Sequence, residues 1–223
     1  AQTALDPHAL LCIVNLKGSP DYVALKAVAH RYIAGSPEMD PLVLERTIDL
    51  LRWVLAECGR RNDYLSRLVE RGAAASADVT PELAAQHEEL RPMTVILDEV
   101  HRLFDPSDNP EAKGTAELLG LVIKAVRSAG ITMICATQLA GVETIPGVVT
   151  RAARLRGCLT VTDHNSYQQI FGSGGGDGAF RQAGVAKFRP GTVLLRTDDG
   201  DPVKVGCHNI TPAVLAQIGK RAL

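Results

Sequence analysis

Two short apolar segments, each ending abruptly in acidic or amide residues, constrain the fold of this chain most strongly. Residues 94–99 read Thr-Val-Ile-Leu-Asp-Glu, and residues 131–138 read Ile-Thr-Met-Ile-Cys-Ala-Thr-Gln. Both patterns are typical of buried parallel strands, and a helical pattern lies between them. A strand–helix–strand unit of this kind is right-handed and opens both strand ends on the ligand-binding side of an α/β sheet.

The residues that end these two segments suit phosphate chemistry. Asp98 can hold a magnesium ion or its bound water, Glu99 can polarise an attacking water, and Gln138 can lie near a phosphate. The alternative is that an apolar strand simply ends in polar residues, and short acidic motifs arise often by chance. No G-x-x-x-x-G-K-[ST] motif occurs in the sequence, so the phosphate cradle expected before such a pair is missing.

Composition limits the kind of partner. The 223 residues suffice for one large α/β domain, and the net charge is −1, so the chain is not a bulk polyanion binder. Nucleic-acid contact would have to come from local basic loops or from repetition in an oligomer. The five cysteines are odd in number and lack C-x-x-C spacing, which indicates a reducing, cytosolic compartment.

The remaining patterns predict an α/β fold with a mainly parallel sheet, helices on both faces and small antiparallel strands near the C-terminus at one edge of the sheet. Beyond strands 93–97 and 131–136, we expect strands at 10–14, 155–161, 185–188, 192–196 and 202–206, and helices at 21–34, 40–72, 81–90, 115–129, 165–171 and from 212 onward. The Gly-rich stretch 172–178 is interpreted as a surface loop, because no lysine of a phosphate loop follows it.

Several arginines have two interpretations. Arg127 near the end of helix 115–129 can complement the helix C-terminus or offer a cation to a phosphate on a neighbouring subunit. Arg151, Arg154 and Arg156 cluster before strand 155–161, where they form either a solvated face or a set of contacts to a nucleotide across an interface.

In this order, the motifs resemble the FtsK/SpoIIIE family of DNA-pumping motors, including TraB-like plasmid-transfer proteins. The matching segments are Asn15-Leu-Lys17-Gly18, Glu57-Cys-Gly-Arg60-Arg61, Leu97-Asp98-Glu99, Arg127-Ser-Ala-Gly130-Ile131, Ala136-Thr137-Gln138, Gly147 and Arg156. The resemblance extends from about residue 10 to 215. Asn15 replaces the usual Asp of the family, and the phosphate loop that should precede residue 10 is absent.

The resemblance implies a RecA-like P-loop NTPase core in a single motor domain, residues 1–223, that is N-terminally incomplete, with helix 40–72 and linker 73–92 inserted between strands. It further implies ATP and Mg²⁺ as cofactors, double-stranded DNA as partner, a homo-hexameric ring and a cytoplasmic location, with any membrane anchor in another part of the protein. The implied roles are catalysis for Glu99, Asp98, Gln138 and Arg127, nucleotide binding for Asp98, Thr137, Lys17 and Arg156, metal binding for Asp98, and DNA binding for Lys113, Arg181 and Lys187.

Two other functions stay open. Type VII secretion motors share this ATPase fold but move polypeptides, and a domain without a phosphate loop can serve as an oligomerisation or partner-binding unit. Without the lysine and backbone amides of that loop, we expect this fragment alone to bind ATP poorly and to hydrolyse none.

Overall fold

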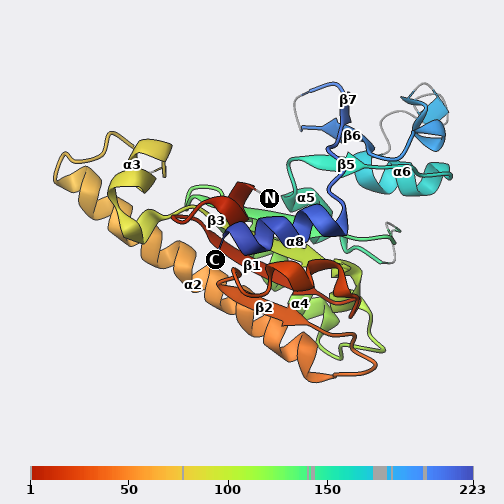
Figure 1. The fold of residues 1–223 in the computed structure, drawn as a ribbon, viewed down its shortest axis with the longest axis horizontal. Coiled ribbons are helices and arrows are strands. Elements are labelled where there is room, and N and C mark those ends of the chain that lie inside the picture. The colour runs from red at the N-terminus through yellow and green to blue at the C-terminus, as the bar shows by residue number, and fades with distance from the viewer. Residues whose placement is uncertain are drawn as a thin grey trace. The chain divides into compact units, whose positions relative to one another are not determined.

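The computed structural model describes residues 2–76, 78–139, 141, 144–172, 180–181, 183–197 and 200–222 (Figure 1). The chain divides into two compact units, Ala1–Gln138 with Thr211–Leu223, and Leu139–Ile210. Each unit has its own β-sheet. The expectation of a single motor domain over residues 1–223 stays a prediction.

The first unit is organised around a parallel sheet of four strands. These are β1 (Leu10–Asn15), β2 (Arg31–Ala34), β3 (Met93–Asp98) and β4 (Ile131–Ala136), in the order β2-β1-β3-β4. The register places Asn15 opposite Asp98, and Asp98 opposite Ala136. The predicted mainly parallel sheet is therefore confirmed, and three of its strand ends form one row.

Residues 21–34, which we expected to form one helix, instead form the short 3₁₀ helix η1 (Pro20–Leu25) and the strand β2. Tyr32 and Ile33 favour a strand, and β2 pairs with β1 along its length, with Gly35 N–H donating to Asn15 O at 3.1 Å. The hydrogen bonds offered by the free edge of β1 therefore outweigh the weak helical pattern of this segment.

The strand order explains why helices cover both faces of the sheet. From β1 the chain moves to β2 on one side of it, and from β2 it crosses back over β1 to β3 and then to β4 on the other side. Because each crossover is right-handed, this reversal of direction places η1 on one face of the sheet and α2 and α4 on the other. On the η1 face, Leu11, Ile13, Leu25 and Ile218 form a buried cluster with Ala4. The predicted coverage of both faces is confirmed (Figure 1).

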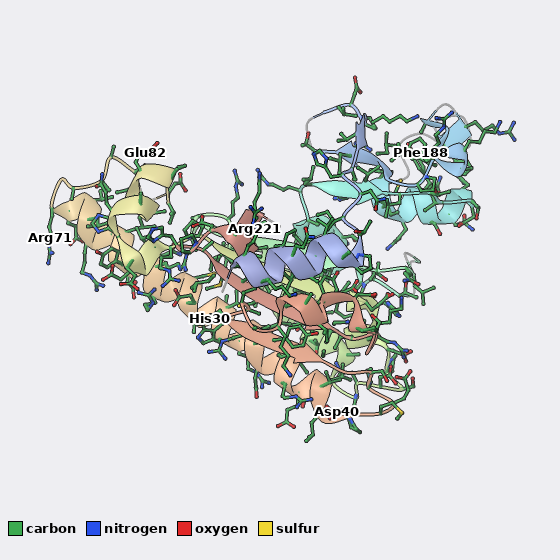
Figure 2. All side chains as sticks on the ribbon, in the orientation of Figure 1. His30, Asp40, Arg71, Glu82, Phe188 and Arg221 are labelled. Atoms are coloured by element: carbon green, nitrogen blue, oxygen red, sulfur yellow. The ribbon has the colours of Figure 1, made fainter. Side chains whose placement is uncertain are left out.

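The helices of the first unit have these bounds: α1 (Gln2–Leu5), α2 (Leu42–Glu70), α3 (Pro81–Gln86), η2 (Glu88–Leu90), η3 (Val100–Phe104), α4 (Ala112–Ala125) and α8 (Pro212–Arg221). The long helix expected at 40–72 is thus present as α2, and Asp40 and Arg71 mark its two ends (Figure 2). The helix expected at 115–129 begins three residues earlier, at Ala112, and ends earlier, at Ala125.

The second unit contains the helices α5 (Gly147–Ala152), α6 (His164–Phe171) and η4 (Val185–Lys187). Its strands β5 (Arg156–Cys158), β6 (Thr192–Arg196) and β7 (Val203–Gly206) form an antiparallel sheet in the order β5-β6-β7. The expectation that the antiparallel strands lie at an edge of the main sheet is therefore wrong in this detail, because they form a sheet of their own. Residues 185–188 were expected to be a strand, but most of this segment is η4.

Aromatic side chains concentrate in the core of this second unit. Tyr167, Phe171 and Phe188 are buried together with Cys158 and Leu194. Phe188 is labelled in Figure 2, and Lys204 Nζ lies 4.7 Å from the centroid of its ring. The core thus joins α6 to β5, β6 and η4. Most of the Gly-rich stretch 172–178 lies outside the described residues. Among the described residues, no helix combines the length and the apolar character needed to cross a bilayer.

Candidate functional site at the carboxyl edge of the sheet

The carboxyl ends of β1, β3 and β4 bring together most of the residues that the motifs singled out. Lys17 follows β1, Glu99 follows β3, and Thr137 and Gln138 follow β4, all at the edge marked by Asp98. The parallel register makes these strand ends neighbours, although their positions in the chain are far apart. The roles assigned to these residues stay predictions.

Asp98 and Glu99 form the acidic part of this site. Glu99 N–H donates to Asp98 Oδ1 at 3.2 Å. Burial, together with the neighbouring Glu99 carboxylate, raises the pKa of Asp98, and burial and Asp98 raise the pKa of the Tyr22 hydroxyl to about 12. A cation bound at this edge would offset the repulsion between the two carboxylates.

The residues at this edge can bind a magnesium ion in the way that nucleotide sites do, through few protein ligands. Among the described residues there is no group of three His, Cys, Asp or Glu side chains that could hold a metal ion. Magnesium typically binds through one or two carboxylates and completes its shell with waters and substrate phosphates. Asp98, which is partly exposed, supplies the carboxylate that such a shell requires.

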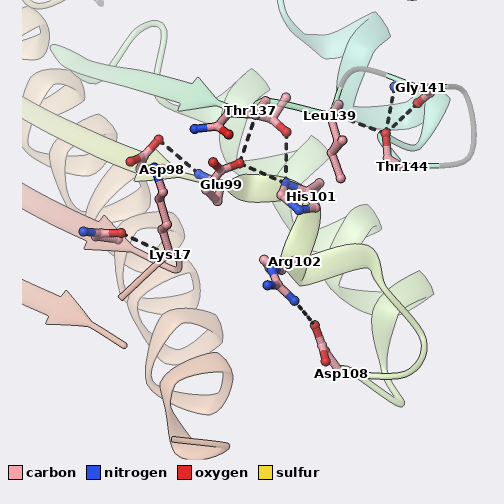
Figure 3. Close-up of polar contacts among 12 residues, drawn as sticks. Lys17, Asp98, Glu99, His101, Arg102, Asp108, Thr137, Leu139, Gly141 and Thr144 are labelled. Atoms are coloured by element: carbon pink, nitrogen blue, oxygen red, sulfur yellow. Dashed lines mark hydrogen bonds and ion pairs between the residues drawn. The ribbon is translucent and has the colours of Figure 1, made fainter. Parts of the chain in front are cut away.

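Glu99 has an unusual backbone conformation. Its φ of 57° and ψ of 46° lie in the left-handed region, and it is the one described residue other than glycine with a positive φ. This conformation costs a non-glycine residue roughly 1–2 kcal/mol. Its side chain is buried and turned toward β4, where Oε2 accepts a hydrogen bond from Gln138 N–H at 3.1 Å (Figure 3). The local strain therefore aims the carboxylate at the end of the neighbouring strand.

His101 is a member of this site that the sequence motifs did not indicate. Its Nδ1 lies 3.2 Å from Glu99 Oε2 and 3.0 Å from Thr137 Oγ1, so it bridges the ends of β3 and β4 (Figure 3). Burial lowers the pKa of His101, and the Glu99 carboxylate opposes that effect. The one sequence feature that could have indicated His101 is its position in the first turn after Glu99, at the end of the strand.

Asn15 organises the turn that carries Lys17. Its side chain is fully buried, its Oδ1 accepts from Lys17 N–H at 3.0 Å, and its Nδ2 donates to Ser19 O at 2.8 Å. Gly18 follows with a φ of 70°, a conformation that favours glycine. An aspartate at position 15 could not donate to Ser19 O, so Asn15 has a structural function that the family's carboxylate would not reproduce.

The segment after Glu99 is fixed by a second set of polar contacts. Arg102 forms ion pairs with Glu38 at 2.6 Å and with Asp108 at 3.0 Å. Asn109 is buried and donates from Nδ2 to Leu103 O at 2.7 Å. These contacts tie the turn between η3 and α4 to the rest of the first unit.

Other predicted residues lie away from this edge or in the second unit. Arg127 is exposed before β4, which has six residues, so at about 3.3 Å per residue roughly 20 Å of strand separates it from Thr137. Arg156 donates to Ala153 O and Ile170 O within the second unit. Lys113, Arg181 and Lys187 are exposed. The structure therefore does not join Arg127 to Glu99 within one copy of the chain.

No profile of a protein family and no curated protein sequence matches this chain. Solved structures do resemble it. The pCW3 conjugation coupling protein TcpA, solved as a monomer form with ATPγS, is 16% identical with a TM-score of 0.70 over 97% of this chain. The cytoplasmic domain of the Thermomonospora curvata type VII secretion ATPase EccC is 16% identical with a TM-score of 0.69 over 97% of it.

A third similar structure contains ATPases 2 and 3 of EssC from Geobacillus thermodenitrificans, with 15% identity and a TM-score of 0.59 over 99% of this chain. This chain spans 57% of the TcpA chain, 24% of the EccC chain and 37% of the EssC chain. The fold is thus that of a P-loop ATPase. More narrowly, it is the fold of FtsK/SpoIIIE-type motor ATPase domains, which confirms the resemblance expected from the motifs.

Proposed function

We propose that this chain is a segment of an ATP-driven motor that moves double-stranded DNA. The observation that carries the proposal is the pair Asp98 and Glu99 at the end of β3, with Glu99 turned through a left-handed backbone toward Gln138 at the end of β4. An exposed strand-end acid would need neither the strain nor the burial. A strained backbone that holds a buried side chain in one direction is common at catalytic sites, which supports the assignment of Glu99 as a base.

In this proposal Glu99 is the general base. Its carboxylate accepts a proton from the attacking water, while the backbone N–H of Gln138 fixes its direction. Magnesium, when bound, would neutralise charge that develops on the phosphates, and Asp98 would hold it directly or through a bound water. The Gln138 side chain is exposed beyond Glu99, in a place where it can orient the water or contact a phosphate.

The similarity to TcpA, a conjugation coupling protein, supports the proposed mechanical function. We assign double-stranded DNA as substrate, in conjugative transfer or chromosome segregation, and a homo-hexamer as the working assembly, with Arg127 and Arg156 acting across subunit interfaces. The exposed cations Lys113, Arg181 and Lys187 are the proposed DNA contacts. The site of action is cytoplasmic, with any attachment to the membrane made by a segment outside this chain.

A second function is favoured by the equally strong likeness to EccC, a type VII secretion ATPase. In that case the motor would move polypeptide, and DNA would not stimulate it. A non-catalytic partner-binding unit is the remaining alternative. The sequence has no lysine-bearing phosphate loop, so we also propose that these 223 residues in isolation hydrolyse no ATP, and that turnover belongs to the full-length protein.

The deciding experiment measures steady-state ATP hydrolysis by the full-length protein that contains this chain, with and without double-stranded DNA. Glu99→Gln should lower turnover at least about a hundredfold, because it removes the base. Glu117→Gln, an exposed acid on α4, is the matched control and should leave turnover unchanged. Turnover that DNA does not stimulate would favour the secretion motor. No turnover at all would favour the partner-binding unit.

A further inference from the structure

The histidine between the two strand ends has no part in the function proposed so far. His101 is largely buried, with 13% of its side chain exposed, and its Nδ1 faces both Glu99 Oε2 and Thr137 Oγ1 at hydrogen-bond distance. Thr137 is 36 residues away in the chain. The contact therefore exists only because β3 and β4 are neighbours in the sheet.

The chemistry of its two partners determines which ring nitrogen of His101 carries hydrogen. An ionised carboxylate can only accept hydrogen bonds, so Nδ1 must carry a hydrogen to face Glu99 Oε2 favourably. A bare Nδ1 would place its lone pair against a carboxylate in a buried setting, which is costly. The geometry thus selects the form that carries hydrogen on Nδ1, which is hydrogen-bonded to Thr137 Oγ1 and lies close to the Glu99 carboxylate.

The Glu99 side chain needs this support because its backbone is strained. Oε2 accepts a hydrogen bond from Gln138 N–H at 3.1 Å, and His101 Nδ1 lies 3.2 Å from the same oxygen, within ion-pair distance. Hydrogen bonds to a charged acceptor are about twice as strong as neutral ones. Both contacts fall on Oε2, so neither of them occupies Oε1, and in the proposed mechanism Oε1 accepts the proton from water.

We propose that His101 is a positioning residue for the Glu99 carboxylate, which it fixes from the side of β4 by donating from Nδ1 while it contacts Thr137. This inference rests on the proposed function, since it assigns His101 a part in presenting the base. His101 does not itself touch the reacting atoms. Its removal should therefore lower the rate of hydrolysis without weakening the binding of ATP.

The test compares two variants in the full-length protein. His101→Phe keeps a planar ring and removes the donor, and should lower kcat for ATP hydrolysis roughly ten- to a hundredfold, the range expected for a lost hydrogen bond to a charged group. KM should change little. His101→Asn keeps a short donor close to the position of Nδ1 and should restore most of kcat.

Two controls separate positioning from a general loss of structure. His87→Phe removes a comparable contact, between His87 Nδ1 and Tyr64 OH at 3.0 Å, which lies away from the site and should leave kcat unchanged. In a Glu99→Gln background, His101→Phe should cause no further loss, because residues that act as one unit are not additive. An additional loss of full size in that background would overturn the proposal.

A spectroscopic measurement makes the contact testable apart from turnover. With isotope-labelled histidine, the signal of His101, assigned by its loss in His101→Asn, should show hydrogen on Nδ1 and should shift in Glu99→Gln but not in Glu117→Gln. Hydrogen on Nε2 instead, or an unchanged kcat in His101→Phe, would overturn the role of His101 alone. No hydrolysis by the wild-type protein would overturn the proposed function and with it any part of His101 in turnover.

Discussion

Asn15 and Asp98 stand opposite each other at the carboxyl ends of neighbouring strands, so an uncharged amide lies beside the carboxylate proposed to hold magnesium. The family pattern that the sequence resembles has an aspartate at this place. Here the amide both avoids a further negative charge and donates to Ser19 O at 2.8 Å, which shapes the turn that presents Lys17.

Asn15→Asp should destabilise the protein, and more so at high pH. The new carboxylate would be buried beside Asp98, so its folded pKa would be raised above the unfolded value of about 3.9. The folded state would then bind more protons, and stability would fall as pH rises through that window. Together with the lost donation to Ser19 O, we expect a loss of roughly 2–4 kcal/mol at pH 8 in urea unfolding. Asn15→Leu, which adds no charge, should give a loss independent of pH.

Asp98→Asn should abolish turnover while slightly stabilising the protein without ligand. Burial and Glu99 raise the folded pKa of Asp98, so its ionisation makes the folded state less stable as pH rises from the unfolded pKa through the folded one. Asparagine removes this loss. Because Asp98 is partly exposed, the gain in urea unfolding at pH 8 should be less than about 1 kcal/mol. It should vanish below the unfolded pKa. Asp63→Asn, at an exposed site on α2, should show no such gain.

Gly219→Ala should destabilise the protein even though Gly219 lies within helix α8. A Cβ at this position would overlap the carbonyl oxygen of Ala24 and push α8 away from η1. Overpacking of this kind costs about 1–3 kcal/mol. The matched control is Gly59→Ala in α2, where nothing lies within 4 Å of the added atom, and where we expect a gain of roughly 0.5–1 kcal/mol. Thermal unfolding of both variants tests this prediction, and a change in stability of the same sign in both would contradict it.

Arg61→Met should cost roughly 2–4 kcal/mol in the free energy of unfolding. Arg61 is buried, and it donates to Glu57 Oε1 at 2.8 Å and to Ala129 O at 2.9 Å, so its loss leaves a buried carbonyl and a carboxylate short of a partner. Glu57 keeps Arg60, which limits the damage. Arg60→Met, at the more exposed of the two arginines, should cost about 1 kcal/mol or less in urea unfolding. A similar cost for both would contradict the burial argument.

The parts of the fold that were predictable from sequence are those with strong local patterns. The segments around Asp98 and Ala136 are apolar runs with abrupt polar ends, and α2 repeats its apolar residues over 29 residues. β2 could not be predicted in the same way. It has only four residues, and the free edge of β1 stabilises it through pairing that no local pattern reveals.

The candidate site likewise has a part that local sequence patterns predict and a part that they do not. The positions of Asp98, Glu99 and Gln138 follow from strand ends, which the sequence marks. The contact of His101 with Thr137 and the left-handed backbone of Glu99 depend on neighbouring strands and on tertiary packing. The spacing of residues in the sequence therefore could not predict them. For the same reason, the donor function of Asn15 was invisible when the residue was compared only with the aspartate of the family pattern.

The hydrogen bond from Gln138 to Glu99 has a mechanical consequence. Gln138 is the last residue of this stretch of the first unit, and Leu139 begins the second. Tension carried along the chain from the second unit therefore acts first on the backbone whose N–H holds Glu99 Oε2. A displacement of that peptide would lengthen the hydrogen bond and release the carboxylate. In the proposed motor, the covalent junction between the two units would transmit a pulling force to the residue proposed as the base.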